Sequence, residues 1–242
     1  MTGRVQGRVA VVTGAAGGLG RAFCRALAAE GATVVGVDIA DQSATAAAVG
    51  DGYRAITADI TDERAVAALP EQLDEPATIL VNNAGTFPVI PFAETTLADW
   101  RRIHALNVEG TFLATRALLP DMRRAGWGRI VMIASAVVWL GPPGMVAYTA
   151  SKAALVGMTR ALAAELGDTG ITVNAITPGL TRTETALTTA VNAQFDHVVA
   201  NQAVPRAEES DDLVSTLLYV CDKGSGFLTG QAINVDGGYA KH

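Results

Sequence analysis

Short apolar segments alternate with longer amphipathic segments along almost the whole chain, and this alternation limits the folds that are possible. The short segments are typical of buried β-strands, and the longer ones have the periodicity of helices. A strand–helix–strand pattern repeated in this way requires right-handed crossovers between parallel strands. The sequence therefore predicts an α/β fold, a doubly wound parallel sheet with helices on both faces. The expected strands are 8–13, 33–38, 54–57, 78–82, 129–134, 171–176 and 232–235, and the expected helices are 18–30, 44–49, 62–73, 97–124, 148–166 and 210–221.

The length and the charge of the chain limit how many domains it forms and which partners it can bind. A chain of 242 residues, 50% of them hydrophobic, buries a large core without needing a second domain. We therefore expect one domain over residues 1–242. The formal net charge is −6 and lysine and arginine do not cluster, so no basic surface is expected for nucleic acid.

The chain lacks the usual signatures of a membrane protein, a disulfide protein or a metalloprotein. No apolar run reaches the roughly 18 residues that span a bilayer. Cys24 and Cys221 have neither a CxxC nor a metal-ligand spacing, which is typical of buried thiols in a reducing compartment. The three histidines are scattered, and no carboxylate cluster joins them. We expect a cytoplasmic protein with no membrane partner and no metal.

One segment breaks the alternation of strands and helices. Residues 181–205 form a long stretch in which we expect no strand, and the stretch carries Leu187, Phe195 and Val198. Such a long excursion from a compact domain is usually functional, often as a lid over a binding site. We predict that residues 181–205 are a substrate-binding lid.

A glycine-rich turn follows the first expected strand and opens the first expected helix. In that context Gly14 permits a tight turn, Gly18 lets the backbone approach a pyrophosphate, and Gly20 lets the helix pack close to the strand. The N-terminus of the helix then faces the anion. We predict that a dinucleotide cofactor binds along Gly14, Gly17, Gly18, Leu19 and Gly20.

Asp38, at the end of the second expected strand, indicates which dinucleotide binds. A carboxylate at this place accepts hydrogen bonds from the adenosine ribose hydroxyls, whereas a 2′-phosphate would meet its negative charge. No arginine or lysine is present at positions 15–17 or 39–41, where a basic group could hold the extra phosphate. The sequence therefore favours NAD over NADP.

Tyr148 and Lys152 share one face of an expected helix, and Ser135 follows an expected strand. A free phenol has a pKa of about 10, so it is a poor base at neutral pH. A positive charge about 4 Å away, at an effective dielectric of about 20, contributes roughly 4 kcal/mol and lowers the pKa of a phenol by about three units. We predict that Lys152 makes Tyr148 an acid–base group and that Ser135 holds the substrate oxygen.

These motifs arrive in one order along the chain, and with them the sequence resembles the short-chain dehydrogenase/reductase family over nearly its whole length. The matching residues are Thr13-Gly14-x-x-x-Gly18-x-Gly20, Asp59, Asn82-Asn83-Ala84-Gly85, Asn107, Ser135, Tyr148-x-x-x-Lys152 and Pro178-Gly179. The resemblance implies a Rossmann-type fold, an NAD-dependent dehydrogenase or ketone reductase, and a homotetramer that packs 97–124 and 148–166 between subunits.

The resemblance also implies roles for single residues. Asp59 and Ile60 would meet the adenine ring, and Asn83, Ala84 and Gly85 would lie beside the adenosine ribose. Asn107 would hold a water that links Lys152 to solvent and would complete the proton relay. Contacts to the nicotinamide end of the cofactor would come from Pro178, Gly179, Thr181 and Thr183.

The expected substrate pocket is apolar and aromatic. Its candidate residues are Phe87, Val137, Trp139, Met145, Leu187 and Phe195. Such surface favours an uncharged, aromatic secondary alcohol or ketone. The pocket segments are similar to those of NAD-dependent 1-phenylethanol dehydrogenases, a group within the same family, although Gly141-Pro142-Pro143-Gly144 and the lid depart from that pattern.

Three other functions stay open at this point. A 3-oxoacyl-carrier-protein reductase would share the fold and catalytic residues, but Asp38 and the acidic charge disfavour it. A sugar or polyol dehydrogenase would use polar lid residues, of which Thr188, Thr189, Asn192 and Gln194 are candidates. A catalytically silent dinucleotide-binding regulatory protein would be expected to have lost Ser135, Tyr148 or Lys152. Arg182 near the lid leaves a carboxylate-bearing substrate open.

Overall fold

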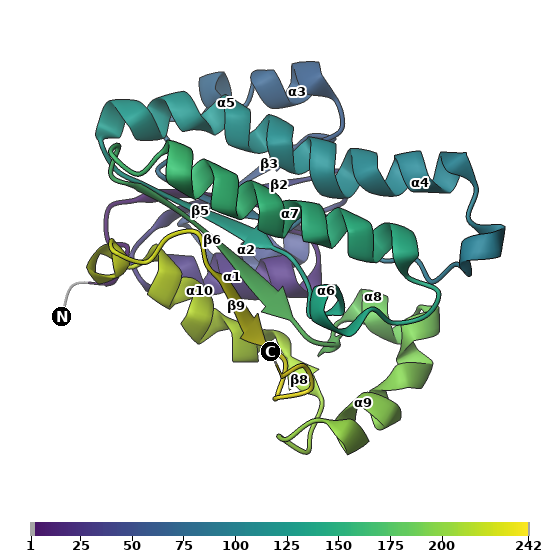
Figure 1. Cartoon of the computed structure of the whole chain (residues 1–242). Helices are drawn as coiled ribbons and strands as arrows, with labels where there is room; N and C mark the ends of the chain where they lie inside the picture. Colours follow the sequence, from purple (N-terminus) through teal and green to yellow (C-terminus); the bar gives the residue numbers. More distant parts are fainter. Residues whose placement is uncertain (1–2, 242) are drawn as a thin grey trace.

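A seven-stranded parallel sheet forms the centre of the computed structural model, which describes residues 3–241 (Figure 1). Residues 1, 2 and 242 lie outside the described part. The strand order is β3-β2-β1-β4-β5-β6-β9, and all neighbouring strands run parallel. The strands are β1 (Val9–Thr13), β2 (Thr33–Asp38), β3 (Tyr53–Thr57), β4 (Ile79–Asn82), β5 (Gly128–Ile133), β6 (Ile171–Pro178) and β9 (Ala232–Val235).

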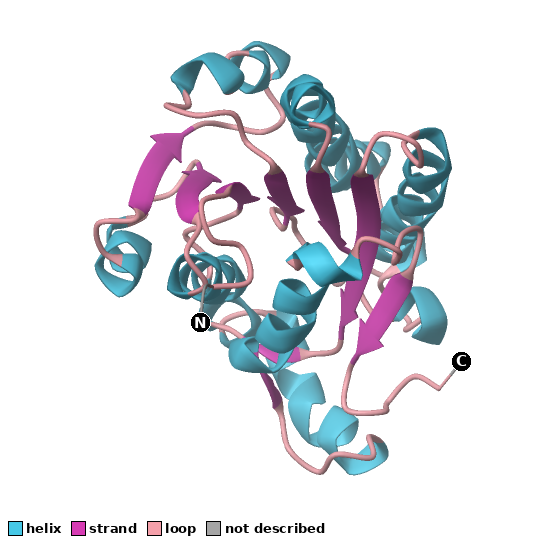
Figure 2. Ribbon diagram, turned by 90° about the vertical axis from the view of Figure 1, so that its left-hand side faces the viewer, coloured by secondary structure: helices cyan, strands magenta, loops and turns pink. Residues whose placement is uncertain are grey.

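Helices cover both faces of this sheet, as Figure 2 shows. One face carries α3, α5 and α7, whose side chains share a buried cluster with the sheet, and the other face carries α1 and α10. The helices are α1 (Gly18–Ala29), α2 (Ser43–Val49), α3 (Glu63–Ala67), α4 (Leu97–His104), α5 (Gly110–Ala125), α6 (Val137–Leu140), α7 (Val146–Glu165), α8 (Glu184–Leu187), α9 (Phe195–Asn201) and α10 (Val214–Cys221).

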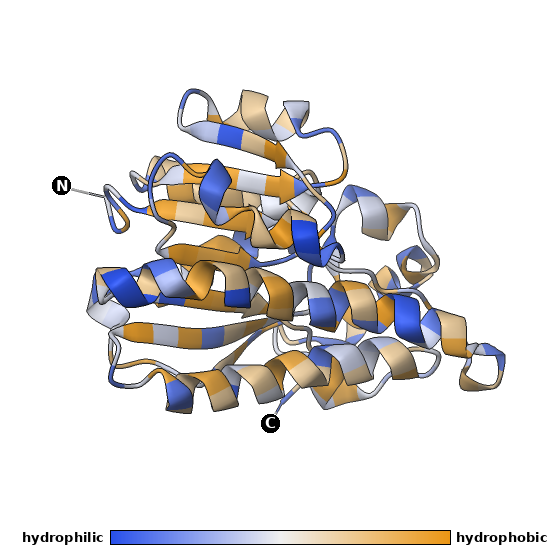
Figure 3. Ribbon diagram, turned by 90° about the horizontal axis from the view of Figure 1, so that it is seen from above, coloured by the Kyte–Doolittle hydropathy of each residue, from blue (hydrophilic) through white to orange (hydrophobic). Residues whose placement is uncertain are grey.

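Alternate residues of a strand point into the two buried clusters, one on each face of the sheet. Val9 and Val11 of β1 face the first, whereas Ala10 and Val12 face the second. Because both faces are covered, the central strands β1 and β4 are buried along their whole length, and Figure 3 shows much of the sheet in orange. The predicted doubly wound α/β fold is therefore confirmed.

The order of the sheet reverses beside β1. The chain runs outward from β1 to β2 and β3, then crosses back to β4, β5 and β6 on the other side. The segments that follow β1 and β4 therefore lead in opposite directions. This place is the switch point of the sheet, where open α/β sheets bind ligands. Residues that follow β1, β2, β4 and β5 meet at this edge.

Several expected elements differ in detail. The statement that 181–205 contains no strand is wrong, because β7 (Thr181–Arg182) pairs in parallel with β8 (Glu208–Glu209). The helix expected over 62–73 divides into α3 and the 3-10 turn η1 (Pro70–Gln72), since Pro70 cannot continue the α-helical hydrogen bonding. A π-helical turn, η3 (Ala105–Glu109), interrupts the helix expected over 97–124.

Two further 3-10 turns and three short helices also differ from the expected elements. The helix expected over 210–221 begins with the 3-10 turn η5 (Ser210–Leu213) and continues as α10. The segment between β7 and β8 contains α8, the 3-10 turn η4 (Ala190–Gln194) and α9. The short helix α6 was not predicted. No helix within residues 3–241 is both long enough and apolar enough to cross a membrane.

Truncating Phe23 tests the packing of α1 against the sheet. Phe23 is fully buried in the second cluster, so we expect Phe23→Ala to lower the free energy of unfolding by about 3–5 kcal/mol. Phe92 of the turn η2 (Phe92–Glu94) is 72% exposed, so Phe92→Ala should change it by less than about 0.5 kcal/mol. Urea unfolding of both variants makes the comparison, and equal losses would contradict this account of the core.

Candidate active site

A cavity of about 500 Å³ lies at the carboxyl edge of the sheet, between the switch point and the segment that joins β7 to β8. Figure 1 shows the arrow of β6 pointing toward α6 and α8 at this edge. The wall contains residues from the glycine turn, from the ends of β2, β4, β5 and β6, and from α7. The polar residues of these elements surround one end of the cavity, and apolar side chains surround the other.

The glycine turn has the shape that a pyrophosphate needs. Gly14 has a φ of +68°, and a Cβ there would lie 2.8 Å from the Cα of Ala84, so only glycine fits. A Cβ on Gly20 would lie 2.1 Å from the carbonyl oxygen of Gly14, which explains the close packing of α1. Gly17 is the N-cap of α1 and no side chain caps that helix, so its first N–H groups are available to an anion. Gly17, Gly18 and Leu19 line the cavity, and their contact with the cofactor stays a prediction.

Asn83 ties the end of β4 to the end of β1. Its side-chain amide donates to the carbonyl oxygens of Thr13 and Gly14, both at 3.0 Å. The hydroxyl of Thr13 in turn accepts from the backbone N–H groups of Asn83 and Ala84, both at 3.1 Å. These four bonds hold the glycine turn against the Asn83–Gly85 loop, and both segments face the cavity.

Asp38 stands at the cavity wall where an adenosine ribose would lie. One carboxylate oxygen accepts from the N–H of Ala16 and the other from the N–H of Ala40, both at 2.9 Å. A carboxylate has about four acceptor sites, so Asp38 keeps acceptor capacity for ribose hydroxyls. Asp59 and Ile60 also line the cavity, and Asp59 accepts from the backbone and the hydroxyl of Thr61 at 2.8 Å. Asp38, Asp59 and Ile60 thus line one cavity, and their contacts with an adenosine stay a prediction.

Tyr148 and Lys152 lie one turn apart on α7 and are both buried in the cavity wall. The ammonium of Lys152 donates to the carbonyl oxygen of Ile133 at 2.7 Å, and its Nζ is 5.9 Å from the centre of the Tyr148 ring. Ser135 follows β5, and its side chain is hydrogen-bonded with that of Tyr148. The structure therefore brings the three predicted catalytic residues together around one point of the cavity.

The protonation states differ from the simple expectation. Burial raises the pKa of Tyr148 to about 12, although the hydrogen bond with Ser135 lowers it. Burial lowers the pKa of Lys152 to about 8. We predicted that Lys152 lowers the pKa of Tyr148, but the protein's own groups raise it. The ammonium of Lys152 donates to the carbonyl oxygen of Ile133, and burial of the phenol has the larger effect on its pKa. At neutral pH the pair is a neutral phenol beside a cation.

Asn107 is fully buried in η3 and lies behind the cavity wall rather than in it. Its side chain accepts from the N–H of Thr86 at 2.8 Å and donates to the carbonyl oxygen of Thr86 and the hydroxyl of Ser151, both at 2.9 Å. Ser151 then donates to the carbonyl oxygen of Tyr148 at 2.7 Å. Asn107 thus joins the loop after β4 to the helix that carries the catalytic tyrosine, and its role in a proton relay stays a prediction.

The substrate end of the cavity is mainly apolar. Phe87, Val137 and Met145 line it as predicted, and the ring of Phe87 meets the ring of Tyr148 edge-on, with 6.3 Å between ring centres. Leu140 lies one turn after Val137 on α6 and also lines it. Pro178, Gly179, Thr181 and Thr183 also line the cavity, and their contacts with a nicotinamide stay a prediction.

Three predicted substrate residues do not line the cavity. Trp139 belongs to the other face of α6 and donates from its indole to the hydroxyl of Thr177 at 3.4 Å. Leu187 is exposed at the end of α8. Phe195 is buried in a small apolar cluster inside the lid, with Ala186 and Val191, and supports the lid instead of facing the substrate. Periodicity could not assign Leu187 and Phe195, because the turns of the lid fix their directions, and the four-residue helix α6 that carries Trp139 is too short to show a periodicity.

Three polar residues also line the cavity wall. Gln194 of η4 was a candidate polar lid residue, whereas His197 of α9 and Tyr239 of the C-terminal segment were not predicted. Arg21 of α1 pairs with Glu184 of α8 at 3.0 Å, which joins the glycine-turn helix to the lid. Arg182 lies outside the cavity wall, 3.9 Å from Glu209. Among residues 3–241, no group of three or more histidine, cysteine, aspartate or glutamate side chains could hold a metal ion.

Comparisons with known proteins identify a matching family and several relatives. Residues 14–240 match the family described as enoyl-(acyl carrier protein) reductase. The chain is 40% identical to the (2S)-[(R)-hydroxy(phenyl)methyl]succinyl-CoA dehydrogenase subunit BbsD of Thauera aromatica, over 97% of each protein. It is 37% identical to a 3-alpha-(or 20-beta)-hydroxysteroid dehydrogenase of Mycobacterium bovis, over 98% of this chain and 91% of the relative.

A solved structure is similarly close. The crystal structure described as a putative NAD(P)-dependent gluconate 5-dehydrogenase of Beutenbergia cavernae, with NADP bound at low occupancy, matches with a TM-score of 0.91. It is 35% identical and the match covers 97% of each chain. The sequence and fold comparisons thus lead to the same group of proteins.

The burial of Lys152 predicts how stability changes with pH. The lysine has a pKa of about 8 in the fold and an ordinary value of 10.5, so the unfolded chain holds the proton more tightly. The free energy of unfolding therefore gains a contribution as pH rises from 8 to 10.5. Lys152→Met removes this titration, so the stability of the variant relative to the wild type should fall by roughly 2–3 kcal/mol between about pH 7 and about pH 10. Urea unfolding measures it, and a constant difference would contradict the burial of a charged lysine.

Proposed function

Because the chain belongs to the short-chain dehydrogenase/reductase family, we propose that it is an NAD-dependent oxidoreductase that interconverts an apolar, aromatic secondary alcohol and its ketone. The observation that carries this proposal is the position of the buried Ser135–Tyr148–Lys152 group. It lies where the cofactor end of the cavity meets an apolar wall that includes Phe87 and Val137. The carbinol carbon of a substrate would therefore meet the acid–base group and the nicotinamide at one point.

Tyr148, Ser135 and Lys152 each have a different role in the proposed reaction. When bound, a nicotinamide dinucleotide supplies the hydride acceptor or donor. Tyr148 takes the hydroxyl proton of the alcohol during oxidation and returns it to the ketone oxygen during reduction. Ser135, whose hydroxyl is already hydrogen-bonded with Tyr148, holds the same substrate oxygen while its charge changes. Lys152 keeps a positive charge next to this group at neutral pH, because its pKa is about 8.

The raised pKa of Tyr148 makes ketone reduction the easier direction of the reaction for the protein without an oxidised cofactor. With a pKa raised to about 12 by burial, the phenol holds its proton at neutral pH and is ready to act as the acid in ketone reduction. Oxidation needs the phenolate, which the positive charge of an oxidised nicotinamide ring would favour. Alcohol oxidation should therefore increase as pH rises above neutrality.

The preference for NAD rests on Asp38. Its carboxylate faces the adenosine end of the cavity, and its backbone partners, Ala16 and Ala40, add no positive charge. A 2′-phosphate placed there would meet a negative group with no compensating cation from positions 39–41. A solved relative contains NADP at low occupancy, so we base the preference of this chain on the local charge at Asp38 and not on that relative.

The aromatic substrate class has two supports. The edge-on contact of Phe87 with Tyr148 places an aromatic wall beside the catalytic oxygen. The name of the Thauera relative describes a hydroxyl on a carbon that carries a phenyl group, which is a benzylic secondary alcohol. The name of the hydroxysteroid relative also describes an apolar alcohol. These relatives, together with the apolar wall, support 1-phenylethanol-like substrates.

A sugar or polyol substrate is the second candidate. Gln194 and His197 bring two polar side chains to the lid side of the cavity, and a solved relative is described as a gluconate 5-dehydrogenase. Thr188, Thr189 and Asn192, the other polar lid residues predicted for this function, do not line the cavity. A 3-oxoacyl thioester remains the third candidate, disfavoured by Asp38.

A substrate panel tests the proposal directly. Purified protein is incubated with racemic 1-phenylethanol, a polyol or a 3-hydroxyacyl thioester, each with NAD or NADP, and NAD(P)H absorbance is followed. We expect NAD-dependent turnover of 1-phenylethanol with a kcat/KM at least about tenfold above that with NADP, a difference of about 1.4 kcal/mol. Preference for the polyol would support the second candidate, and preference for NADP would contradict the role of Asp38.

Replacing Tyr148 by Phe tests the acid–base group while keeping the ring. The edge-on packing against Phe87 should persist, so NADH binding measured by fluorescence should remain near the wild-type value. Turnover should fall by about 10² to 10⁴, the usual contribution of a positioned acid–base group. Tyr239→Phe is the matched control, since Tyr239 lines the same cavity but is placed in no chemical step. Equal activity of Tyr148→Phe and wild type would contradict the mechanism.

A further inference from the structure

An ion pair beside the cavity joins the helix of the glycine turn to the segment between β7 and β8. The guanidinium of Arg21 donates to a carboxylate oxygen of Glu184 at 3.0 Å and to the carbonyl oxygen of Ala16 at 3.2 Å. The N–H of Ala16 donates in turn to Asp38 at 2.9 Å. Neither Arg21 nor Glu184 lines the cavity. Arg21 therefore connects α1, the glycine turn and the start of α8 without facing a bound molecule.

Glu184 lies against the part of the glycine turn where a cofactor phosphate is expected. A Cβ on Gly18 would lie 3.3 Å from a carboxylate oxygen of Glu184 and 3.5 Å from the Cβ of Thr183. Gly18 and Thr183 both line the cavity. The hydroxyl of Thr183 accepts from the N–H of Ala186 at 3.2 Å and so caps α8 in this position. A negative charge thus stands beside the N-terminus of α1, the end of a helix that attracts anions.

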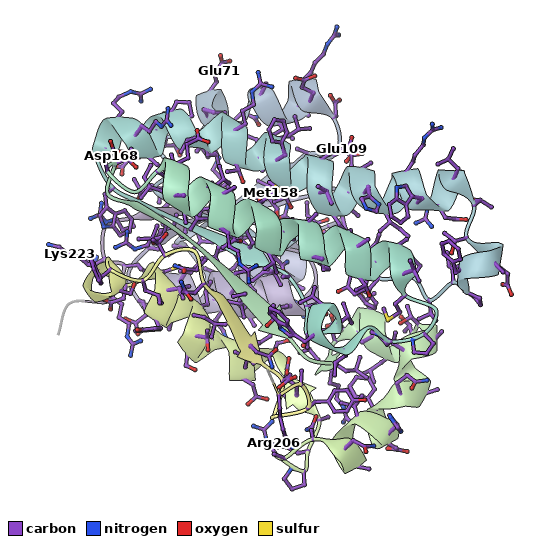
Figure 4. All side chains as sticks on the ribbon, viewed as in Figure 1. Glu71, Glu109, Met158, Asp168, Arg206 and Lys223 are labelled. Carbon is purple, nitrogen blue, oxygen red and sulfur yellow. The ribbon has the colours of Figure 1, made fainter. Side chains whose placement is uncertain are left out.

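Arg21 supplies the positive charge that balances Glu184. It is the only lysine or arginine in residues 13–24. Arg206, near the returning end of the segment between β7 and β8, pairs instead with Asp212 at 2.6 Å. Figure 4 shows Arg206 at the bottom of the molecule, away from α8. The charge next to the first turn of α1 therefore depends on the balance within the Arg21–Glu184 pair.

We propose that Arg21 and Glu184 together set the affinity of the glycine turn for the pyrophosphate of the cofactor. Arg21 attracts the pyrophosphate and Glu184 offsets that attraction. Both act through their charge, and neither touches the reacting atoms. Glu184 thereby keeps the affinity below the value that Arg21 alone would give. The inference rests on the proposed function only in placing a dinucleotide at the glycine turn.

This role differs from that of a structural clamp between α1 and α8. If the pair only held the two helices together, removal of either charge would break the same contact and weaken cofactor binding. A charge role gives changes of opposite sign. Without the charge of Glu184, an unpaired cation remains beside the pyrophosphate and binding becomes tighter. Without the charge of Arg21, an unpaired anion remains there and binding becomes weaker.

The dissociation constant of NADH, measured by fluorescence at about 0.1 M salt, tests the proposal. We expect Glu184→Gln to bind NADH about twofold to fivefold more tightly than wild type, and Arg21→Gln to bind it more weakly by a similar factor, since exposed charges have modest effects. The double variant has a neutral pair like the wild type and should return to within about twofold of it. At about 1 M salt, where the Debye length is about 3 Å, each difference should shrink.

Two further variants separate charge from local structure. Arg25→Gln is the matched control, because Arg25 lies one turn further along α1 and forms an exposed ion pair with Asp211. It removes the same charge farther from the glycine turn, so NADH binding should change by less than about twofold. Arg21→Lys keeps the charge but loses the forked hydrogen bonds of the guanidinium, and it should bind NADH more tightly than Arg21→Gln.

The sign of the changes decides the outcome. Weaker binding in both single variants, or an unchanged dissociation constant in Glu184→Gln, overturns the proposal. If Arg21→Gln does not fold, the sign of the Glu184→Gln change decides alone. Absence of NADH binding in the wild type overturns the proposal together with the assigned cofactor. Failure of the aromatic alcohol assay, with NADH binding intact, removes only the proposed substrate.

Discussion

The hydrogen bonds between the ends of β1 and β4 hold together the part of the fold on which the site depends. The two strands are neighbours in the sheet, yet the chain leaves them in opposite directions, so nothing in the sheet ladder itself fixes their loops. Asn83 and Thr13 supply that link with four short bonds. The glycine turn is thereby set against the Asn83–Gly85 loop. A cavity forms only because these loops stay at a fixed separation, with Asp38 at one end and Tyr148 at the other.

Burial, rather than the nearest charge, controls the chemistry of the catalytic pair. A charge on an exposed helix face at Tyr148–Lys152 spacing would lower the pKa of the phenol. In the fold the same lysine turns to the carbonyl oxygen of Ile133, and desolvation moves the two pKa values in opposite directions. The result is a phenol that keeps its proton beside a lysine that gives its proton up more readily than usual. Such a pair responds strongly to any further positive charge, because there is little water to screen it.

The sequence predicted the sheet and the cofactor end of the site because those features depend on short-range patterns. Apolar runs between amphipathic segments define buried parallel strands, and a glycine's position in a strand–turn–helix unit defines its backbone role. The lid is different. Phe195 and Leu187 have the apolar character of pocket residues, but one packs inside the lid and the other faces outward. Their directions depend on α8, η4 and α9, short turns whose geometry is set by tertiary contacts rather than by periodicity.

Glu208 shows the same limit most clearly. In the sequence it stands directly before a second glutamate, Glu209, yet Glu208 is buried and Glu209 is exposed. The two-residue pairing of β7 with β8 turns one side chain inward and the other outward, since successive residues of a strand point to opposite sides. A strand this short has no detectable alternation in the sequence. The pairing nevertheless matters for the site, because it brings a buried carboxyl group behind the cavity wall, where it accepts hydrogen bonds from Gly179 and Thr181.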